Sequence, residues 1–215
     1  MSTTAETPNI FLFVPNLIGY GRIVLAFVAI LLMPSFPVAA SVSYFLSAFL
    51  DAFDGYAARL YNQGTRFGAM LDQLTDRLTF LALLMMLGQL YPRCLFIFQL
   101  TAIIDIASHW LHLHATDLTG KNTHKDSDNP ILHYYYTSRP FLFFMCFGNE
   151  AFFSLLYIHA FYTGPAFLGV SFVSFLAFLT FPVAFVKQLI SLVHLVVASQ
   201  TIAEFDVAQR QLKSQ

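Results

Sequence analysis

Charged residues are scarce in this chain: lysine, arginine, aspartate and glutamate make up only 11% of its 215 residues. Soluble domains carry about a quarter charged residues, so the shortage argues against a soluble globular domain. Hydrophobic residues account for 57% of the chain and aromatic residues for 17%. This composition is typical of an integral membrane protein.

Other absences narrow the class of protein further. The formal net charge is only -1, so no general positive field favours nucleic acid or a polybasic lipid anchor. The two cysteines, Cys94 and Cys146, lie in apolar surroundings, which indicates neither a disulfide framework nor a zinc site. The apolar runs are long and continuous, whereas a transmembrane β-barrel needs short segments of alternating polarity. The lack of an internal repeat argues against a transporter built from duplicated halves.

Six apolar runs are long enough to cross a membrane as helices. They cover residues 11–33, 38–60, 65–90, 94–115, 141–162 and 165–197. Pro34, Pro37 and Pro92 mark turns between runs. Because no basic segment precedes the first run, we expect a retained helix and not a cleaved signal peptide. The sequence therefore predicts an all-α integral membrane protein, a bundle of six transmembrane helices forming one domain over residues 1–215.

The placement of basic residues predicts the orientation of this bundle. Arg59 and Arg66 lie between the second and third runs, and Lys121 and Lys125 lie between the fourth and fifth. The opposite side offers Arg93 alone. By the positive-inside rule both termini then face the cytosol. The turn between the second and third runs is cytosolic as well, so a site at this turn would open toward the cytosol.

Four aspartates interrupt the second and third apolar runs: Asp51, Asp54, Asp72 and Asp76, here called the acidic cluster. Asp51 and Asp54 are three residues apart and Asp72 and Asp76 four, so the members of each pair share one helix face. A short turn joins the two helices and makes them antiparallel neighbours. Burying carboxylates in a membrane is costly, so something positive must lie among them. Hard oxygen ligands favour Mg²⁺ or Mn²⁺. A pair of such ions, which could clamp a diphosphate, is the simplest candidate.

The residues between the aspartates support a phosphate-binding site. Gly55 and Ala58 remove side-chain bulk where a base or phosphate could approach the helix. Arg59 adds a fixed positive charge suited to phosphate oxygens. Thr65 begins the next helix, where a hydroxyl and free backbone amides favour an anion. The region therefore combines groups for binding cations with groups for binding phosphate.

Two other interpretations of the aspartates compete with this site. An aspartate inside a membrane is often paired with an arginine, and Asp76 beside Arg77 could be such a pair. A divalent cation channel or transporter would explain the carboxylates but not Gly55 and Arg59 at fixed spacing. An arginine beside a cation path is counterproductive, so an enzyme is favoured.

The run from residue 51 to residue 76 resembles the signature of the CDP-alcohol phosphatidyltransferases, and every fixed position of that signature is filled. The pattern is Asp51-x2-Asp54-Gly55-x2-Ala58-Arg59-x8-Gly68-x3-Asp72-x3-Asp76. Over nearly the whole chain the sequence is similar to the eukaryotic phosphatidylinositol synthases of that family, most visibly in residues 11–20, 62–72, 107–114 and 135–140. On the first helix Asn16 and Arg22 match the family pattern, whereas Gly19 stands where a hydroxyl residue is common.

The resemblance implies transfer of the phosphatidyl group from CDP-diacylglycerol to myo-inositol, giving phosphatidylinositol and CMP. It implies two metal ions, Mg²⁺ or Mn²⁺, held by Asp51, Asp54, Asp72 and Asp76. Asp76 would also act as the general base for the inositol hydroxyl. The contacts to CDP-diacylglycerol would come from Gly55, Arg59 and Thr65. The family further implies a homodimer in the endoplasmic reticulum membrane, with the active site facing the cytosol.

The identity of the acceptor is the least constrained part of this hypothesis. The same chemistry could use glycerol 3-phosphate or serine. A phosphorylated acceptor would need more basic residues than Arg59, Arg77 and Arg139, so a neutral polyol fits better. Asp105 and His109 share a face of the fourth run with His112, either as a wall of the inositol pocket or as an internal hydrogen-bonded set. Together with Arg139, Asp105 and His109 are the candidate inositol contacts.

Overall fold

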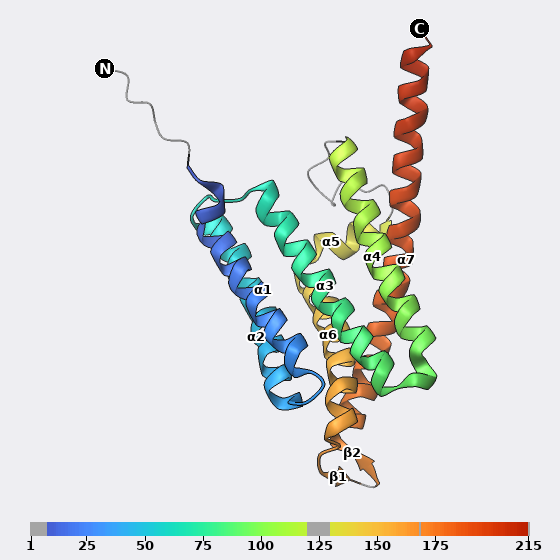
Figure 1. Cartoon of the computed structure of the whole chain (residues 1–215). Helices are drawn as coiled ribbons and strands as arrows, with labels where there is room; N and C mark the ends of the chain where they lie inside the picture. Colours follow the sequence, from blue (N-terminus) through green and yellow to red (C-terminus); the bar gives the residue numbers. More distant parts are fainter. Residues whose placement is uncertain (1–7, 120–129, 168, 215) are drawn as a thin grey trace, which may run out of the picture. The chain divides into compact units, whose positions relative to one another are not determined.

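A computed structural model of the chain describes residues 8–119, 130–167 and 169–214. In these ranges the protein is helical apart from one short hairpin, so the predicted all-α class is confirmed (Figure 1). The elements in chain order are η1 (Ile10–Leu12), α1 (Val14–Leu32), α2 (Pro37–Leu60), α3 (Arg66–Leu90), η2 (Pro92–Cys94), α4 (Leu95–Thr119), α5 (Pro130–Thr137), α6 (Arg139–Phe161), β1 (Ala166–Phe167), β2 (Val170–Ser171) and α7 (Phe172–Lys213).

Each of the six predicted runs corresponds to one long helix, although some helices extend beyond their run; the helices are α1, α2, α3, α4, α6 and α7. Among the described residues, four segments are long and apolar enough to cross a membrane: α1, η2 together with α4, α6 and α7. The helices α2 and α3 are of similar length, with 24 and 25 residues, but they carry the acidic cluster and several arginines. Length and composition therefore make this a multi-pass membrane protein.

Helix boundaries follow local sequence signals. Proline occupies the first turn of α1, α2 and η2, where its missing N–H costs nothing. The side-chain oxygen of Thr65 accepts a hydrogen bond from the N–H of Gly68 at 3.0 Å and so caps the start of α3. Asn62, with φ of 52°, lies in the turn that precedes it. The α2–α3 turn is therefore defined by its own residues.

The last predicted run differs from the structure at both ends. A hairpin precedes α7, with Ala166 paired to Ser171 in antiparallel β1 and β2. Gly164 and Gly169 have φ of 71° and 81°, which helical residues do not adopt, and this explains the later start. At the other end α7 continues to Lys213, because residues 198–213 keep good helix formers without a glycine or proline.

Some predictions fall on residues outside the described ranges. Lys121 and Lys125, which contributed to the orientation argument, belong to this group. The fourth run was predicted to end at residue 115, but α4 continues to Thr119. The hydroxyls of Thr116 and Thr119 donate hydrogen bonds to the backbone carbonyls four residues earlier, at 2.9 Å and 2.8 Å. Both hydroxyls are therefore satisfied within the helix.

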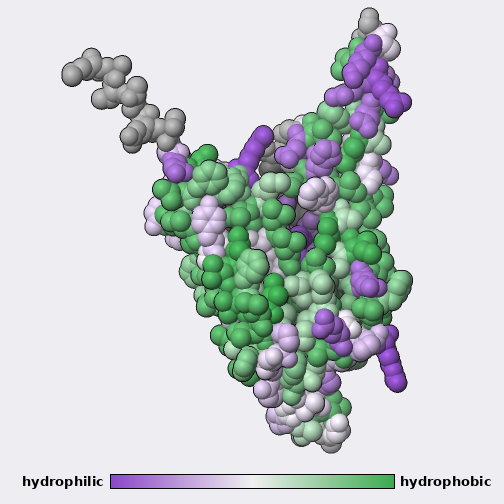
Figure 2. Space-filling view, in the orientation of Figure 1, coloured by the Kyte–Doolittle hydropathy of each residue, from purple (hydrophilic) through white to green (hydrophobic). Residues whose placement is uncertain are grey.

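The chain forms two compact units, one ending at Leu83 and the other beginning at Leu84. In the first unit α1 and α2 pack against each other. In the second, α7 packs against both α4 and α6. Hydrophobic residues cover much of the visible surface of the helices, whereas the end of α7 is hydrophilic (Figure 2). Large apolar side chains such as Leu31 and Phe178, both 77% exposed, are suited to contact with lipid.

Candidate active site

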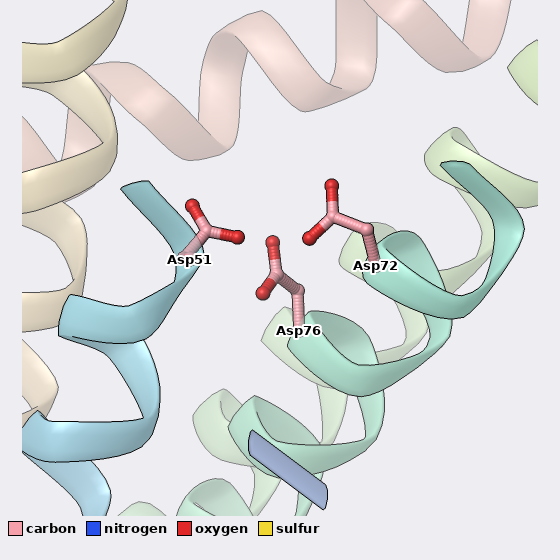
Figure 3. A group of neighbouring side chains, drawn as sticks. All are labelled: Asp51, Asp72 and Asp76. Carbon is pink, nitrogen blue, oxygen red and sulfur yellow. The ribbon is translucent and has the colours of Figure 1, made fainter. Parts of the chain in front are cut away.

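Carboxylates from two helices meet in the first unit. Asp51 comes from α2, while Asp72 and Asp76 come from successive turns of α3, and their side chains point toward one another (Figure 3). Each offers a carboxylate oxygen, and these oxygens all lie within 4.8 Å of one another. The structure thus brings together the two acidic faces that helical spacing predicted. This grouping of hard oxygen atoms is suited to a divalent cation.

A guanidinium group from α1 lies at the centre of the acidic cluster. The Nη1 atom of Arg22 is 2.8 Å from Asp51 Oδ1 and 2.6 Å from Asp54 Oδ2. The same nitrogen is 2.6 Å from Asp72 Oδ1, and Nη2 donates to Asp76 Oδ1 at 2.5 Å. One arginine therefore contacts all four aspartates, although it lies up to 54 residues away from them in the sequence.

The members of this cluster differ in exposure. The side chain of Arg22 is only 1% exposed and that of Asp54 only 12%. The side chains of Asp51, Asp72 and Asp76 are between 36% and 44% exposed. The cluster therefore has a closed side, formed by Arg22 and Asp54, and an accessible side, formed by the other three carboxylates. A ligand would reach the accessible side first.

Small residues allow α1 and α3 to approach each other beside the cluster. A Cβ atom on Gly19 would lie 3.0 Å from the side chain of Leu71. A Cβ atom on Gly68 would meet the side chain of Asn16, which is almost completely buried. Asn16 is held in place because its amide donates to the carbonyl of Ile10 at 2.7 Å. These contacts explain why glycine, and not a larger residue, precedes Asp72 by one turn.

Two further hydrogen bonds fix α1 in the first unit. The hydroxyl of Ser47 on α2 donates to the backbone carbonyl of Arg22 at 3.0 Å. The N–H of Val14, at the start of α1, donates to the side chain of Gln63 in the α2–α3 turn at 2.9 Å. The first bond holds Arg22 at the level of the aspartates, and the second ties the start of α1 to the turn that joins the two acidic helices.

The residues predicted to contact the donor lie close to the cluster in the sequence. Arg59 folds back along α2, so that its Nη1 lies 3.6 Å from the position of a Cβ on Gly55. Gly55 therefore leaves room for the arginine side chain on the face that also carries Asp51. Thr65 caps α3 in the adjoining turn. Their contact with a donor molecule stays a prediction.

The geometry around Arg22 tests whether these residues fit a divalent ion. Three carboxylate oxygens surround a single nitrogen at 2.6–2.8 Å, although that nitrogen carries only two hydrogens. This is the arrangement of oxygens around a cation, and Nη1 stands in for one. Carboxylate oxygens are also the ligands that Mg²⁺ and Mn²⁺ prefer. The donor set therefore fits Mg²⁺ or Mn²⁺.

Arg77 contributes less to this cluster than its sequence position suggested. Its Nη2 lies 3.6 Å from Asp76 Oδ2, a longer separation than any Arg22 contact. Asp76 and Arg77 therefore do form an ion pair, but Asp76 is bound more closely by Arg22. Arg77 is a secondary positive charge at the edge of the cluster.

The polar residues predicted on the fourth run form a set of their own in the second unit. His109 lies with its Nδ1 2.7 Å from the carbonyl oxygen of Asp105 and 3.7 Å from Asp105 Oδ1. His112 stacks on His194 of α7, with ring centroids 5.1 Å apart. Arg139 is the first residue of α6 and is exposed. A role of Asp105, His109 or Arg139 in binding inositol stays a prediction.

Two residues of these clusters were missed by reasoning from the sequence. Arg22 was matched to the family pattern but not placed among the aspartates, and His194 was given no role. A signal for Arg22 was present, since an arginine within an apolar run must find a carboxylate partner. The signal for His194 is similar, since it is a histidine in the middle of an apolar run. In the structure this residue is 2% exposed.

The apolar helices and the carboxylates define a class: helical membrane proteins with an oxygen-ligand site of the kind that holds divalent cations. Within that class, the family model of the CDP-alcohol phosphatidyltransferases matches residues 12–131. The chain belongs to the CDP-alcohol phosphatidyltransferase family. The matched region contains α1, α2 and α3 entirely, and therefore the whole acidic cluster.

Characterised relatives extend the similarity over almost the full chain. The CDP-diacylglycerol–inositol 3-phosphatidyltransferase of Rattus norvegicus is 52% identical, covering 95% of this chain and 98% of the relative. The enzyme of the same name from Drosophila melanogaster is 49% identical, covering 99% and 95%. That from Saccharomyces cerevisiae is 36% identical, covering 94% and 90%. No solved structure matches the chain. The family predicted from the aspartate pattern is thereby confirmed.

Proposed function

We propose that this protein is a CDP-diacylglycerol–inositol 3-phosphatidyltransferase, which transfers a phosphatidyl group to myo-inositol and releases CMP. The observation that carries the proposal is 52% identity over 95% of the chain to a relative with that activity. An identity of this level over 95% of this chain and 98% of the relative extends through both compact units. The acidic cluster supplies the chemical reason why such a reaction is possible here.

Asp51, Asp54, Asp72 and Asp76 are the proposed metal ligands. The partly exposed carboxylates are presented together from two helices, and Asp54 lies behind them. When bound, a pair of Mg²⁺ or Mn²⁺ ions would hold the diphosphate oxygens and neutralise the charge that develops on them. The protein's own contribution is to keep four flexible side chains within reach of one another before the substrate arrives.

Asp76 is the proposed general base. In the reaction a hydroxyl oxygen of inositol forms a bond to the β-phosphorus of CDP-diacylglycerol. The bond between that phosphorus and the bridging oxygen breaks, and CMP leaves with the oxygen. The hydroxyl proton passes to the carboxylate of Asp76. In a loose phosphoryl-transfer transition state this proton can leave late, so the position of Asp76 matters more than its basicity.

The donor is proposed to bind along the cytosolic end of α2 and the start of α3. Gly55 presents backbone without a side chain, and Arg59 lies over it with its guanidinium. A guanidinium recognises phosphate oxygens in a bidentate manner. Thr65 adds a hydroxyl at the start of α3, where backbone N–H groups favour an anion. The three residues would therefore contact the CDP part of the donor.

The membrane arrangement is proposed from the same residues. Six spans, formed by α1, α2, α3, α4, α6 and α7, would place both termini in the cytosol, because Arg59 and Arg66 lie at one end of the α2–α3 pair. The acidic cluster would then open to the cytosol, where inositol and CMP are soluble. A homodimer in the endoplasmic reticulum membrane and a single domain over residues 1–215 complete the proposal.

Release of CMP by the purified protein tests this function. The full chain would be placed in lipid nanodiscs with CDP-diacylglycerol and Mn²⁺, and offered inositol, glycerol 3-phosphate and serine in separate reactions. We expect CMP and phosphatidylinositol with inositol, and no CMP above background with the other two. Release that required glycerol 3-phosphate or serine would contradict the inositol assignment. An Asp51→Asn/Asp72→Asn variant is the control for contaminating activity.

A further inference from the structure

Arg22 occupies the place that a metal ion would need. Its Nη1 lies within 2.8 Å of oxygens from Asp51, Asp54 and Asp72. Asp51 and Asp72 also belong, together with Asp76, to the group of carboxylates that can jointly offer oxygens to an ion, and Asp76 is bound by Nη2 of the same guanidinium. A divalent ion bound to the same oxygens would lie within a few ångströms of the guanidinium, and the two positive charges would repel each other strongly. Arg22 and a metal ion therefore cannot share these oxygens in the present arrangement.

The guanidinium of Arg22 is held through its two terminal nitrogens. Both terminal nitrogens contact carboxylates. Within the part of the chain that the structure describes, the Nε of Arg22 is buried without a hydrogen-bond partner. An arginine built solely to stay in place would be expected to use this donor too, because an unsatisfied buried N–H is unfavourable. The carboxylates alone hold the group, so it can be released when a stronger cation takes them.

The charge balance explains why such a group is present. Four carboxylates without a counter-ion would repel one another inside a membrane protein. Arg22 touches all four, and Arg77 lies 3.6 Å from Asp76. Arg22 thus keeps ligands from α2 and α3 together while no metal is bound. The backbone of Arg22, anchored by Ser47, stays at the level of the cluster whatever the side chain does.

We propose that Arg22 is a tethered counter-ion of the acidic cluster, which holds the ligand oxygens in the metal-free protein and is displaced when Mg²⁺ or Mn²⁺ binds. This deepens the proposed function and rests on it, since it concerns the metal ions of that same site. Arg22 is then a positioning residue that competes with the metal ion for the carboxylates of the acidic cluster. Arg22 then sets a minimum charge density for the metal ions that bind to the acidic cluster, because an ion of low charge density cannot displace a guanidinium from four carboxylates.

The experiment measures Mn²⁺ binding directly, without substrate, by the electron paramagnetic resonance signal of free Mn²⁺ in titrations of the detergent-solubilised full chain. Arg22→Met keeps an apolar stem but removes the charge. Arg22→Lys keeps the charge on one nitrogen and reaches fewer carboxylates. The matched control is Arg93→Met, which removes an exposed arginine from the second unit. Thermal unfolding without metal is recorded for each protein.

We expect Arg22→Met to bind Mn²⁺ at least about tenfold more tightly than the unmodified protein, since a competing cation has been removed. Arg22→Lys should lie between the two, and Arg93→Met should be unchanged. Without metal, Arg22→Met should unfold at a lower temperature, and Mn²⁺ should restore more of its stability than it adds to the unmodified protein. A role of Arg22 in structure alone would lower the stability without tightening metal binding.

Binding by Arg22→Met that is equal to or weaker than that of the unmodified protein would overturn the proposal. If Arg22→Met does not fold, Arg22→Lys decides in the same way, with tighter binding in support and equal or weaker binding against. Should Mn²⁺ bind and CMP be released by the unmodified protein while either variant gains no affinity, the inference fails and the proposed function stands. Should neither the unmodified protein nor the variants bind Mn²⁺, the inference and the metal part of the proposed function fail together.

Discussion

A Cβ atom on Gly68 would lie only 2.7 Å from the Oδ1 of Asn16. This relationship links the first helix to the third exactly one turn before Asp72, so the spacing of α1 and α3 is set next to the acidic cluster. The side chain of Asn16 cannot easily give way, because it is 1% exposed and bound to the carbonyl of Ile10. Gly68 is therefore required by the close approach of a buried amide.

Gly68→Ala should lower the free energy of unfolding by about 1–3 kcal/mol, as overpacking of a tight contact does. It should also reduce CMP release, because moving α3 away from α1 moves Asp72 and Asp76 as well. Thermal unfolding and initial rates measure the two effects. Gly21→Ala is the matched control, since a Cβ at Gly21 would have open space around it, with no described atom outside its own stretch of helix within 4 Å. Equal behaviour of the two variants would contradict this account.

Asp76→Asn should lower turnover by about 10²–10⁴-fold, which is the usual contribution of a general base. Binding of CDP-diacylglycerol should persist, because Gly55 and Arg59 are unchanged. Single-turnover rates and donor binding by fluorescence anisotropy of a labelled analogue separate the two quantities. Asp206→Asn, at an exposed position near the end of α7, provides the control for loss of a carboxylate. Retained turnover in Asp76→Asn would exclude this residue as the base.

Arg59→Gln should raise the KM for CDP-diacylglycerol by about tenfold or more, because a charge-assisted hydrogen bond to phosphate is lost. The KM for inositol should change little. Initial rates over a matrix of both substrate concentrations give the two constants. Arg66→Gln removes an exposed arginine seven residues away and serves as the control. A rise in the KM for inositol with an unchanged KM for CDP-diacylglycerol would instead assign Arg59 to the inositol-binding site.

Chelation of divalent ions should abolish CMP release while leaving most of the thermal stability. The reason is that Arg22 contacts all four carboxylates and so limits their mutual repulsion in the metal-free protein. Activity in EDTA, activity after Mn²⁺ or Mg²⁺ is returned, and the Tm in each state provide the measurements. Full activity in excess EDTA would contradict the metal requirement.

The sequence indicated the helices well because their signals are local. Prolines at the helix starts and the cap at Thr65 lie within a turn of the boundary that they define. The spacing of Asp72 and Asp76 likewise puts both on one face without any knowledge of the partner helix. The start of α7 was misplaced because a short hairpin depends on positive φ at Gly164 and Gly169, which an apolar run does not reveal.

The centre of the site could not be located in the same way. Arg22 reaches Asp54, Asp72 and Asp76 across 32, 50 and 54 residues of sequence, and periodicity within one helix contains no information on such pairs. The unequal exposure of Asp54 and its neighbours also depends on how three helices pack. Composition indicated that a positive charge was needed, but only the packing of α1 shows which residue supplies it.

The length of α7 has a practical consequence. At about 1.5 Å per residue, its 42 residues extend for about 63 Å, roughly twice the hydrocarbon thickness of a bilayer. Its last turns carry the hydrophilic side chains seen at the end of this helix in Figure 2. A fluorophore or an affinity handle attached near Lys213 would therefore stand clear of detergent or lipid on a stiff helical spacer. The protein offers a natural point of attachment for surface immobilisation and for distance measurements to the bilayer.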